Sequence, residues 1–193
     1  MNEEENSNKK RLEEYAELAK NSLVRVQYSC GGNSTGIDEP ENIPIVDDVY
    51  YTVASESETN AIVELLANSH LPVSDLNAEE RTFLSATSGG KLIGCVAVET
   101  HEDSGLLRSL AVTEDFRGKG IGKKLVTEAE SRAKSNNLKC LYLLTTTASG
   151  FFPQLGWTIA ERSAAPDSIK NSSEFASVCP STAVFMSKNL LPV

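Results

Sequence analysis

Residues 106–122 read LLRSLAVTEDFRGKGIG, an apolar strand that runs directly into a glycine-rich turn. Glycine lets a backbone approach a bulky group closely and adopt left-handed conformations. Apolar residues then recur at 3- and 4-residue steps and predict a helix over 120–136, whose first N–H groups and dipole favour an anion. The turn therefore predicts a phosphate or pyrophosphate site, formed by Arg117, Gly118, Lys119, Gly120, Ile121 and Gly122.

The turn matches neither of two common nucleotide-binding motifs. A Walker loop requires G-x-x-x-x-G-K-[ST], and no Ser or Thr follows a lysine at that spacing here. The dinucleotide fingerprint G-x-G-x-x-G fails because Lys123 stands where its third glycine belongs. The alternative stays open that this is a glycine-rich entrance to a helix that binds nothing.

Length and composition restrict the class of protein. The chain has 193 residues, 40% of them hydrophobic and 23% charged, as in a soluble globular domain with an extension. The net charge of −9 argues against a nucleic-acid partner, because phosphate backbones are bound by clustered Lys and Arg. No apolar run approaches the roughly 18 residues of a membrane span. The acidic start MNEEENSNKKRLEEY lacks an apolar signal core, so we expect a cytoplasmic protein without a membrane partner.

Two regions differ in composition. Residues 1–48 form an acidic N-terminal extension with 11 acidic and 5 basic side chains. A short helix is expected over 9–22, followed by a linker at 29–44 that is rich in Gly, Ser, Asn and Pro. Residues 49–193 form the second region, in which strand and helix patterns alternate. The four cysteines are far apart without a C-x-x-C pair, so we expect neither a zinc site nor a disulfide framework.

The second region predicts an α/β fold. Residues 106–112 and 140–146 are continuous apolar runs of the kind buried inside such a sheet. Gly89 and Gly90 predict the turn of a hairpin. The remaining elements expected are a first strand over 49–55, a helix over 55–71, the hairpin strands within 81–100 and a closing strand over 182–190.

The spacing Arg117-x-x-Gly120-x-Gly122 after an LAV-type strand resembles the acetyl-CoA signature of the GNAT acetyltransferases. Residues 141–157, LYLLTTTASGFFPQLGW, are similar to the next strand, helix and closing aromatic of that family. LLRSLAV, LYLLTTTASGFF and SSEFASVCPSTAV resemble most the acetyltransferases of arsenic-resistance operons, whose relatives acetylate phosphinothricin and arsinothricin. They also look related to the acetyltransferase domain of N-acetylglutamate synthases.

The resemblance implies the GNAT fold for residues 49–193. This is a mixed, mostly antiparallel twisted sheet with helices on both faces and a V-shaped split between strands four and five. Backbone groups left unpaired at the split suit the amide-rich pantetheine arm of acetyl-CoA. The residues implied in this role are Leu110, Ala111 and Val112, with Phe152 lining the pocket. Acetyl-CoA is then the cosubstrate, no metal is needed, and a homodimer is left open.

The usual GNAT catalytic groups are missing. Leu106 or Leu107 occupies the strand-four position where many members carry a glutamate base. Glu99 is the nearest substitute, acting through water, and its alternative is an exposed strand-end carboxylate. Phe152 replaces the tyrosine that protonates the leaving thiolate. Thr145 aligns with a hydroxyl segment of N-acetylglutamate synthases and becomes the candidate acid, with simple packing or an ordered water as alternatives.

Arg108 is the candidate for acceptor binding. It is a cation in an apolar strand, and its planar fork suits a carboxylate, phosphinate or arsinate. The alternative is a salt bridge to an internal acid such as Glu99. Ser109 also counts as a substrate residue, although strand alternation turns it to the opposite face. By family analogy the segment 162–181 caps the acceptor site, with candidate contacts Arg162, Ser173, Cys179 and Ser181; Cys179 has the alternative of a small buried residue.

The expected function is acetyl transfer from acetyl-CoA to the amino group of a small acidic amino acid. The resemblance adds an arsenical or phosphinate analogue as an equivalent acceptor and implies a role in arsenic or antimetabolite resistance. The alternatives are an amino-acid acetyltransferase of the N-acetylglutamate synthase type and a non-catalytic module that binds acyl-CoA. His70 and His101 lie in expected loops without a partner motif, and we expect both on the surface.

Overall fold

A mixed sheet with the strand order β1-β2-β3-β4-β5-β7-β6 frames the part of the protein that the structure describes. This computed structural model describes residues 48–73, 76 and 81–191, so residues 1–47 of the predicted extension over 1–48 lie outside the described residues. The strands are β1 (Val49–Val53), β2 (Arg81–Ser88), β3 (Lys91–His101), β4 (Ser104–Val112), β5 (Cys140–Thr145), β6 (Thr158–Ile159) and β7 (Val184–Asn189). Neighbouring strands are antiparallel except for β4 and β5, which are parallel.

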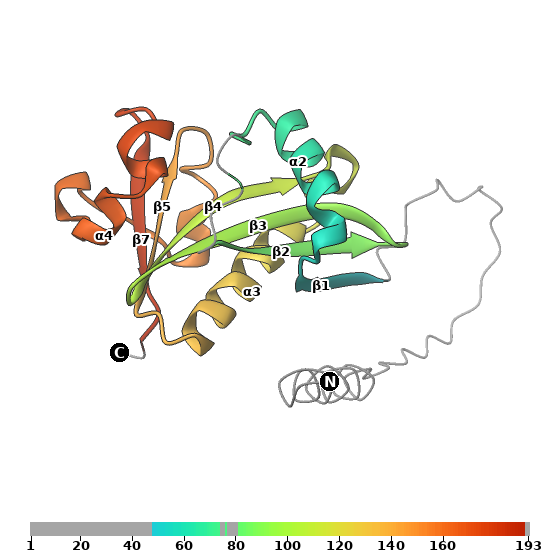
Figure 1. Ribbon diagram of the computed structural model, residues 1–193, viewed down its shortest axis with the longest axis horizontal. Helices are drawn as coiled ribbons and strands as arrows, with labels where there is room; N and C mark the ends of the chain where they lie inside the picture. Colours follow the sequence, from blue (N-terminus) through green and yellow to red (C-terminus); the bar gives the residue numbers. More distant parts are fainter. Residues whose placement is uncertain (1–47, 74–75, 77–80, 192–193) are drawn as a thin grey trace, which may run out of the picture. The chain divides into compact units, whose positions relative to one another are not determined.

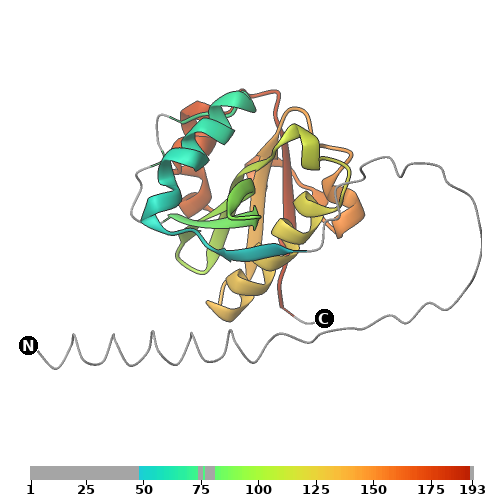
Figure 2. The same cartoon turned by 90° about the vertical axis from the view of Figure 1, so that its right-hand side faces the viewer.

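Helices cover both faces of the sheet, as predicted (Figures 1 and 2). The buried side of α2 (Thr59–Asn68), with Leu66 at its centre, packs on Cys95 of β3. The buried side of α3 (Ile121–Ser135), with Leu125, packs on the other face, where Val96 belongs to the same core cluster. Cys95 and Val96 serve different layers because successive side chains of a strand point to opposite faces.

The predicted split between β4 and β5 is present. The two strands pair only from Ser104 opposite Cys140 to Leu106 opposite Tyr142. Beyond this point β4 continues to Val112, while β5 stays paired with β7 as far as Thr145. The described residues therefore offer no strand partner for the β5 side of β4 above Leu106, and the sheet opens there (Figure 1).

The narrow end of the split depends on a glycine. A Cβ at Gly105 would lie 2.6 Å from Leu141 Cδ2 and 3.0 Å from Leu138 Cδ1. Separations below about 3 Å are far inside ordinary contact between carbon atoms. Gly105 thus lets β4 and β5 approach each other just below the point where they separate.

The chain between β5 and β7 differs in part from the prediction. The helix expected within residues 141–157 is only the short 3₁₀ turn η3 (Phe152–Leu155). Gly156, with a φ of +81°, ends this turn in a left-handed conformation. After β6 come η4 (Arg162–Ala164), α4 (Asp167–Lys170) and the one-turn π-helix η5 (Glu174–Val178), which form the expected insertion before β7.

None of the helices within the described ranges is both long and apolar enough to cross a membrane.

Candidate active site

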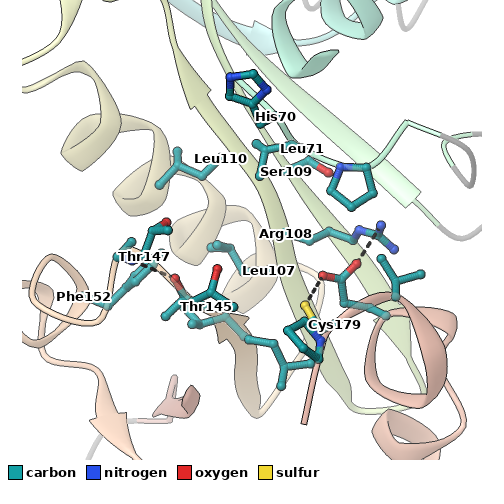
Figure 3. Close-up of a pocket in the computed structure, with 18 residues that line it drawn as sticks. His70, Leu71, Leu107, Arg108, Ser109, Leu110, Thr145, Thr147, Phe152 and Cys179 are labelled. Carbon is teal, nitrogen blue, oxygen red and sulfur yellow. Dashed lines mark hydrogen bonds and ion pairs between the residues drawn. The ribbon is translucent and has the colours of Figure 1, made fainter. Parts of the chain in front are cut away.

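A cavity of about 340 Å³ lies at the open end of the split (Figure 3). Its walls come from four places in the chain: the end of β4, the end of β5 with the loop after it, the segment after α2, and η5 with the residues that follow it. The lining residues are 70–72, 107–110, 143–148, 152, 174 and 178–180. The volume is in the range of sites for small molecules.

A β-bulge sets the side chains of β4 at this cavity. On β3, Cys95 pairs with Ala111 and Ala97 pairs with Arg108, so two residues of β4 oppose one residue of β3. The bulge includes Ser109, whose φ is +55°. Strand alternation predicts that Ser109 faces away from Arg108. The bulge interrupts this alternation, and both residues line the cavity together with their neighbours Leu107 and Leu110.

Arg108 is buried, with 6% of its surface exposed, and pairs with two carboxylates. Its Nη1 lies 3.2 Å from Oε2 of Glu99, and its Nη2 lies 2.7 Å from Oε2 of Glu174. The internal salt bridge to Glu99, which the sequence left as an alternative, is therefore present. The contact with Glu174 places the same guanidinium on the wall of the cavity.

Glu99 lies behind Arg108 and does not line the cavity. Its Oε2 accepts a hydrogen bond of 2.8 Å from Arg81 Nη2, and its Oε1 lies 2.9 Å from His101 Nε2. Burial alone would raise the pKa of Glu99, but the hydrogen bond from Arg81 and the charges of Arg81, His101 and Arg108 lower it below the ordinary value. This carboxylate is a counterion and a weak proton acceptor, so its role as base stays a prediction without support from the geometry.

The two histidines have different positions. His101 is the last residue of β3 with only 12% of its side chain exposed, so its predicted surface placement is wrong. His70 is exposed and lines one end of the cavity. It follows α2 with a φ of +56°, and its N–H donates to the carbonyl of Ala67.

Glu174 was not among the site residues predicted from the sequence. This residue is the first of η5, is 7% exposed, and lines the cavity. In Figure 3 one dashed line joins the guanidinium of Arg108 to its carboxylate, and another joins that carboxylate to Cys179. The available signal was an acidic residue in the EFASVCPS segment, which was expected to cap the acceptor site.

Cys179 is a hydrogen-bond donor in this arrangement. Its Sγ lies 3.0 Å from Oε1 of Glu174. Burial, followed by the hydrogen bond and the negative charge of Glu174, raises the pKa of Cys179 to about 12. The thiol is therefore protonated near neutrality, and it is not a ready nucleophile.

The other candidates on the cap lie outside the cavity. Arg162 holds η5 from its far side: Nη2 donates to the carbonyl of Phe175 at 3.1 Å, and the guanidinium lies 4.4 Å from the Phe175 ring centroid. Ser173 and Ser181 are exposed and do not line the cavity. Substrate contact by these three residues stays a prediction.

Thr145 and Phe152 line the cavity on the β5 side. Thr145 Oγ1 accepts a hydrogen bond of 2.9 Å from the backbone N–H of Ala148, which leaves its own O–H proton to be donated elsewhere. Phe152 is buried, with ring centroids 5.1 Å from Phe151 and 5.6 Å from Trp157. Phe152 has no group that can donate a proton, so Thr145 is the better placed acid of the two.

The glycine turn forms an exposed loop before α3. Gly118 and Gly120 have left-handed φ values of +75° and +82°, which explains why glycine is required there. No side chain caps the helix at Gly120, so the first N–H groups of α3 remain available to a ligand. Ile121 is buried in the core, so only its backbone can contact an anion. Lys119 and Arg117 are exposed beside the turn.

The turn is adjacent to the open edge of β4. A Cβ at Gly122 would lie 3.7 Å from Val112 Cγ2 and 3.7 Å from Phe151 Cζ. Arg117 Nε donates a hydrogen bond of 3.0 Å to the carbonyl of Val112. Leu110 lines the cavity, whereas the Ala111 side chain packs toward α2, so Ala111 can contribute only backbone groups at the split. An extended ligand can therefore run from the turn along β4 into the cavity, and this path fits a coenzyme with a pyrophosphate and an amide-rich arm.

No set of three or more His, Cys, Asp or Glu side chains among the described residues is placed to hold a metal ion.

Comparison with known proteins agrees with this geometry. Residues 79–159 match the family described as the acetyltransferase (GNAT) domain. The fold is similar to that of N-acetylglutamate synthase from Neisseria gonorrhoeae complexed with coenzyme A and N-acetyl-glutamate. That superposition has a TM-score of 0.65 with 21% identity and covers 75% of this chain and 36% of the synthase chain. The fold is thus the GNAT fold, with its one parallel strand pair at β4 and β5.

Two relatives are similar in sequence. The chain is 38% identical over 90 residues to an uncharacterized N-acetyltransferase of Chlorobaculum tepidum, covering 46% of this chain and 57% of that protein. It is 36% identical over 84 residues to an amino-acid acetyltransferase of Ectopseudomonas mendocina, covering 42% of this chain and 19% of that protein. The chain therefore spans little more than half of the first relative and about a fifth of the second.

Proposed function

We propose that the protein is an acetyl-CoA-dependent N-acetyltransferase whose acceptor is a small acidic amino acid, or its phosphinate or arsenical analogue. The observation that carries the proposal is a buried arginine, Arg108, in the wall of the cavity at the split. The donor side of the site fits acetyl-CoA, and the arginine fits an anionic acceptor. By resemblance, the setting is arsenic or antimetabolite resistance.

The donor side is supported by three features that adjoin one another. The left-handed Gly118 and Gly120 open the turn to a pyrophosphate, and the uncapped start of α3 offers N–H groups. Above Leu106, the edge of β4 that faces β5 has no strand partner among the described residues. Peptide-like groups of a pantetheine arm satisfy such backbone groups. The thioester end of the ligand then reaches the cavity near Thr145.

The acceptor side is supported by the charge of Arg108. Its guanidinium offers a planar set of N–H donors, and the same fork already holds two carboxylates. An acceptor carboxylate, phosphinate or arsinate that contacts Arg108 from the cavity replaces or shares the contact with Glu174. A neutral acceptor lacks that interaction.

The chemistry requires a neutral amine, a polarised thioester carbonyl and a proton for the departing thiolate. The amine attacks the thioester directly in a ternary complex, so no acyl-enzyme forms. Thr145 donates its O–H proton toward the thiolate while Ala148 N–H supports its oxygen. Phe152 keeps that part of the pocket apolar.

The test is steady-state thiol release from acetyl-CoA with arsinothricin, phosphinothricin and glutamate as acceptors and glutamine as the neutral-side-chain control. Turnover of the acidic acceptors well above glutamine supports the proposal. Faster turnover of glutamate than of the analogues favours the N-acetylglutamate synthase type. Tight acetyl-CoA binding without turnover of any amine contradicts the proposal and favours a non-catalytic acyl-CoA module.

A further inference from the structure

We infer that Glu174 is the catalytic base, which takes a proton from the acceptor ammonium group before the amine attacks the thioester. This inference rests on the proposed function, because it requires an acceptor that carries both an amine and an acid group. It assigns to the cap segment a role for which the sequence offered only Glu99. Glu174 lies on η5, far along the chain from strand β4.

The position of Glu174 in the cavity wall supports its role as base. Within the described ranges, Glu174 is the one carboxylate among the residues that line the cavity. Glu99 is separated from the cavity by Arg108, with which it pairs. An acceptor amine inside the cavity can therefore reach Glu174, directly or through one water, without moving the sheet.

An ion pair and a hydrogen bond orient the carboxylate of Glu174. Oε2 of Glu174 lies 2.7 Å from Arg108 Nη2, and Oε1 accepts the Cys179 thiol at 3.0 Å. Each carboxylate oxygen has two acceptor positions, so these contacts fix the orientation of the group without exhausting its capacity. Glu174 is therefore held in place and can still accept a hydrogen bond from an ammonium group.

The charges of Arg108, Glu174 and the acceptor balance one another before and after proton transfer. The charged and titratable groups around Glu174 are Arg108 on β4 with Glu99 behind it, the Cys179 thiol, Arg162 under η5, and His70 at the end of the cavity. An acceptor acid group that binds Arg108 adds one negative charge beside Glu174. When Glu174 then takes the ammonium proton, it loses its own charge and the acceptor becomes the counterion of Arg108. An uncompensated buried charge is avoided at both stages.

The backbone around Glu174 also supports a functional role for this residue. Glu174 begins a π-helical turn, a rare geometry that occurs frequently at functional sites. Arg162 fixes this turn through the carbonyl and the ring of Phe175. The segment thus carries its own support for a precisely oriented carboxylate on the cavity side.

The proton balance is complete. Glu174 removes one proton from the ammonium group, and the neutral amine forms a bond to the thioester carbonyl carbon. The C–S bond breaks and Thr145 donates its O–H proton to the thiolate. Thr145 takes the second proton of the nitrogen in return. Glu174 returns its proton to solvent, so the products are the N-acetyl amino acid, free thiol and one proton.

The test compares Glu174→Gln, which keeps the shape of the side chain and one acceptor oxygen but removes the negative charge, with wild type. Glu161→Gln is the matched control, because Glu161 is exposed and does not line the cavity. We expect Glu174→Gln to lower kcat about 10²- to 10⁴-fold and to remove the acid limb of the pH–kcat profile. The KM for acetyl-CoA should stay within about twofold, and Glu161→Gln should match wild type throughout. Glu174→Asp, which keeps a carboxylate, should retain the acid limb and part of the activity.

A second acceptor separates proton transfer from a structural role. An analogue whose nitrogen is already neutral at the assay pH, such as a hydroxylamine, needs no base to remove an ammonium proton. With this acceptor, the ratio of the wild-type kcat to the kcat of Glu174→Gln should fall toward one. An unchanged kcat in Glu174→Gln, or an equal deficit for both kinds of acceptor, overturns the inference and leaves the proposed function intact. Absence of turnover by wild type with every amine overturns both.

Discussion

The two sides of the cavity are built differently. The donor side consists of consecutive residues: β4, the glycine turn and the start of α3 follow one another within residues 104–135. The acceptor side brings together β2, β3, β4 and η5, and its ion pairs join Arg81, Glu99, Arg108 and Glu174. One side is made of backbone groups in fixed conformations, and the other of buried charges that depend on tertiary contacts.

The difference has energetic consequences. An exposed side chain of the glycine turn, such as Arg117, can be removed with a small effect on folding. Buried charges, by contrast, stabilise only while all partners are present, since each unpaired charge is costly to bury. Substitutions on the donor side should therefore affect binding of acetyl-CoA, and those on the acceptor side should affect stability and acceptor binding together.

The largest effect is expected for Arg108→Ala. This change leaves Glu174 without its cation inside the protein, so we expect the free energy of unfolding to fall by about 3–5 kcal/mol. Arg117→Ala is the donor-side control. Arg117 is exposed, so its removal should change the free energy of unfolding by less than about 0.5 kcal/mol while weakening acetyl-CoA binding.

Urea unfolding and acetyl-CoA titration of both variants provide the measurement. Equal losses of stability in the two variants would remove the distinction between the two sides. Arg108→Lys keeps the charge but not the fork, so a variant that folds while its KM for the acidic acceptor rises would separate anion recognition from stability.

The next effect concerns Thr145→Val, which removes a hydroxyl from the boundary of the two sides. If Thr145 protonates the thiolate, kcat should fall about 10²-fold while the affinity for acetyl-CoA stays close to wild type. Thr145→Ser retains the hydroxyl and should recover most of the rate. Equal rates for the Val and Ser variants, measured by thiol release, would assign the proton to an ordered water.

A smaller effect is expected for Gly120→Ala. A left-handed conformation costs about 1–2 kcal/mol for a residue with a Cβ, so we expect a similar loss of stability and roughly tenfold weaker coenzyme A binding. Gly90→Ala is the matched control, because Gly90 also has a positive φ, +74°, and an open surface. Both variants should lose similar stability, but only Gly120→Ala should lose affinity in a calorimetric titration. Loss of affinity in neither variant would mean that the turn binds nothing.

The sequence predicted what depends on local pattern. Both long helices and strands β1 to β5 and β7 lie within or close to ranges predicted from apolar patterns and the resemblance. The split followed from the resemblance, and β6 was not predicted. The glycine turn was readable because its chemistry resides in consecutive backbone groups. Thr145 and Arg108 were candidates from the sequence, and both line the cavity because they lie on β5 and β4.

The errors arise where local pattern is overridden. The bulge at Ser109 interrupts the alternation of β4, and the residue type does not predict a φ of +55°. His101 is enclosed because its strand places it beside Glu99. Glu174 gains its position from a contact with Arg108 across the fold, and single-sequence patterns contain no record of such a contact.

The smallest effect is expected from the pH dependence of stability at Glu99, because burial and the neighbouring cations act in opposite directions on this carboxyl. Burial raises the pKa, while the hydrogen bond from Arg81 and the charges of Arg81, His101 and Arg108 lower it to a net value below the ordinary 4.5. A carboxyl whose pKa is lower in the folded state stabilises the protein above its unfolded pKa, and this contribution is lost as the pH falls through the folded value. The free energy of unfolding of wild type, measured in urea, should therefore fall more steeply below about pH 4.5 than that of Glu99→Gln, with the two curves parallel from pH 5 to 7. If wild type instead gains stability relative to Glu99→Gln as the pH falls, the pKa of Glu99 is raised. Glu99 would then be a stronger proton acceptor than its contacts indicate, and Glu99 on β3 would become the candidate base in place of Glu174 on η5.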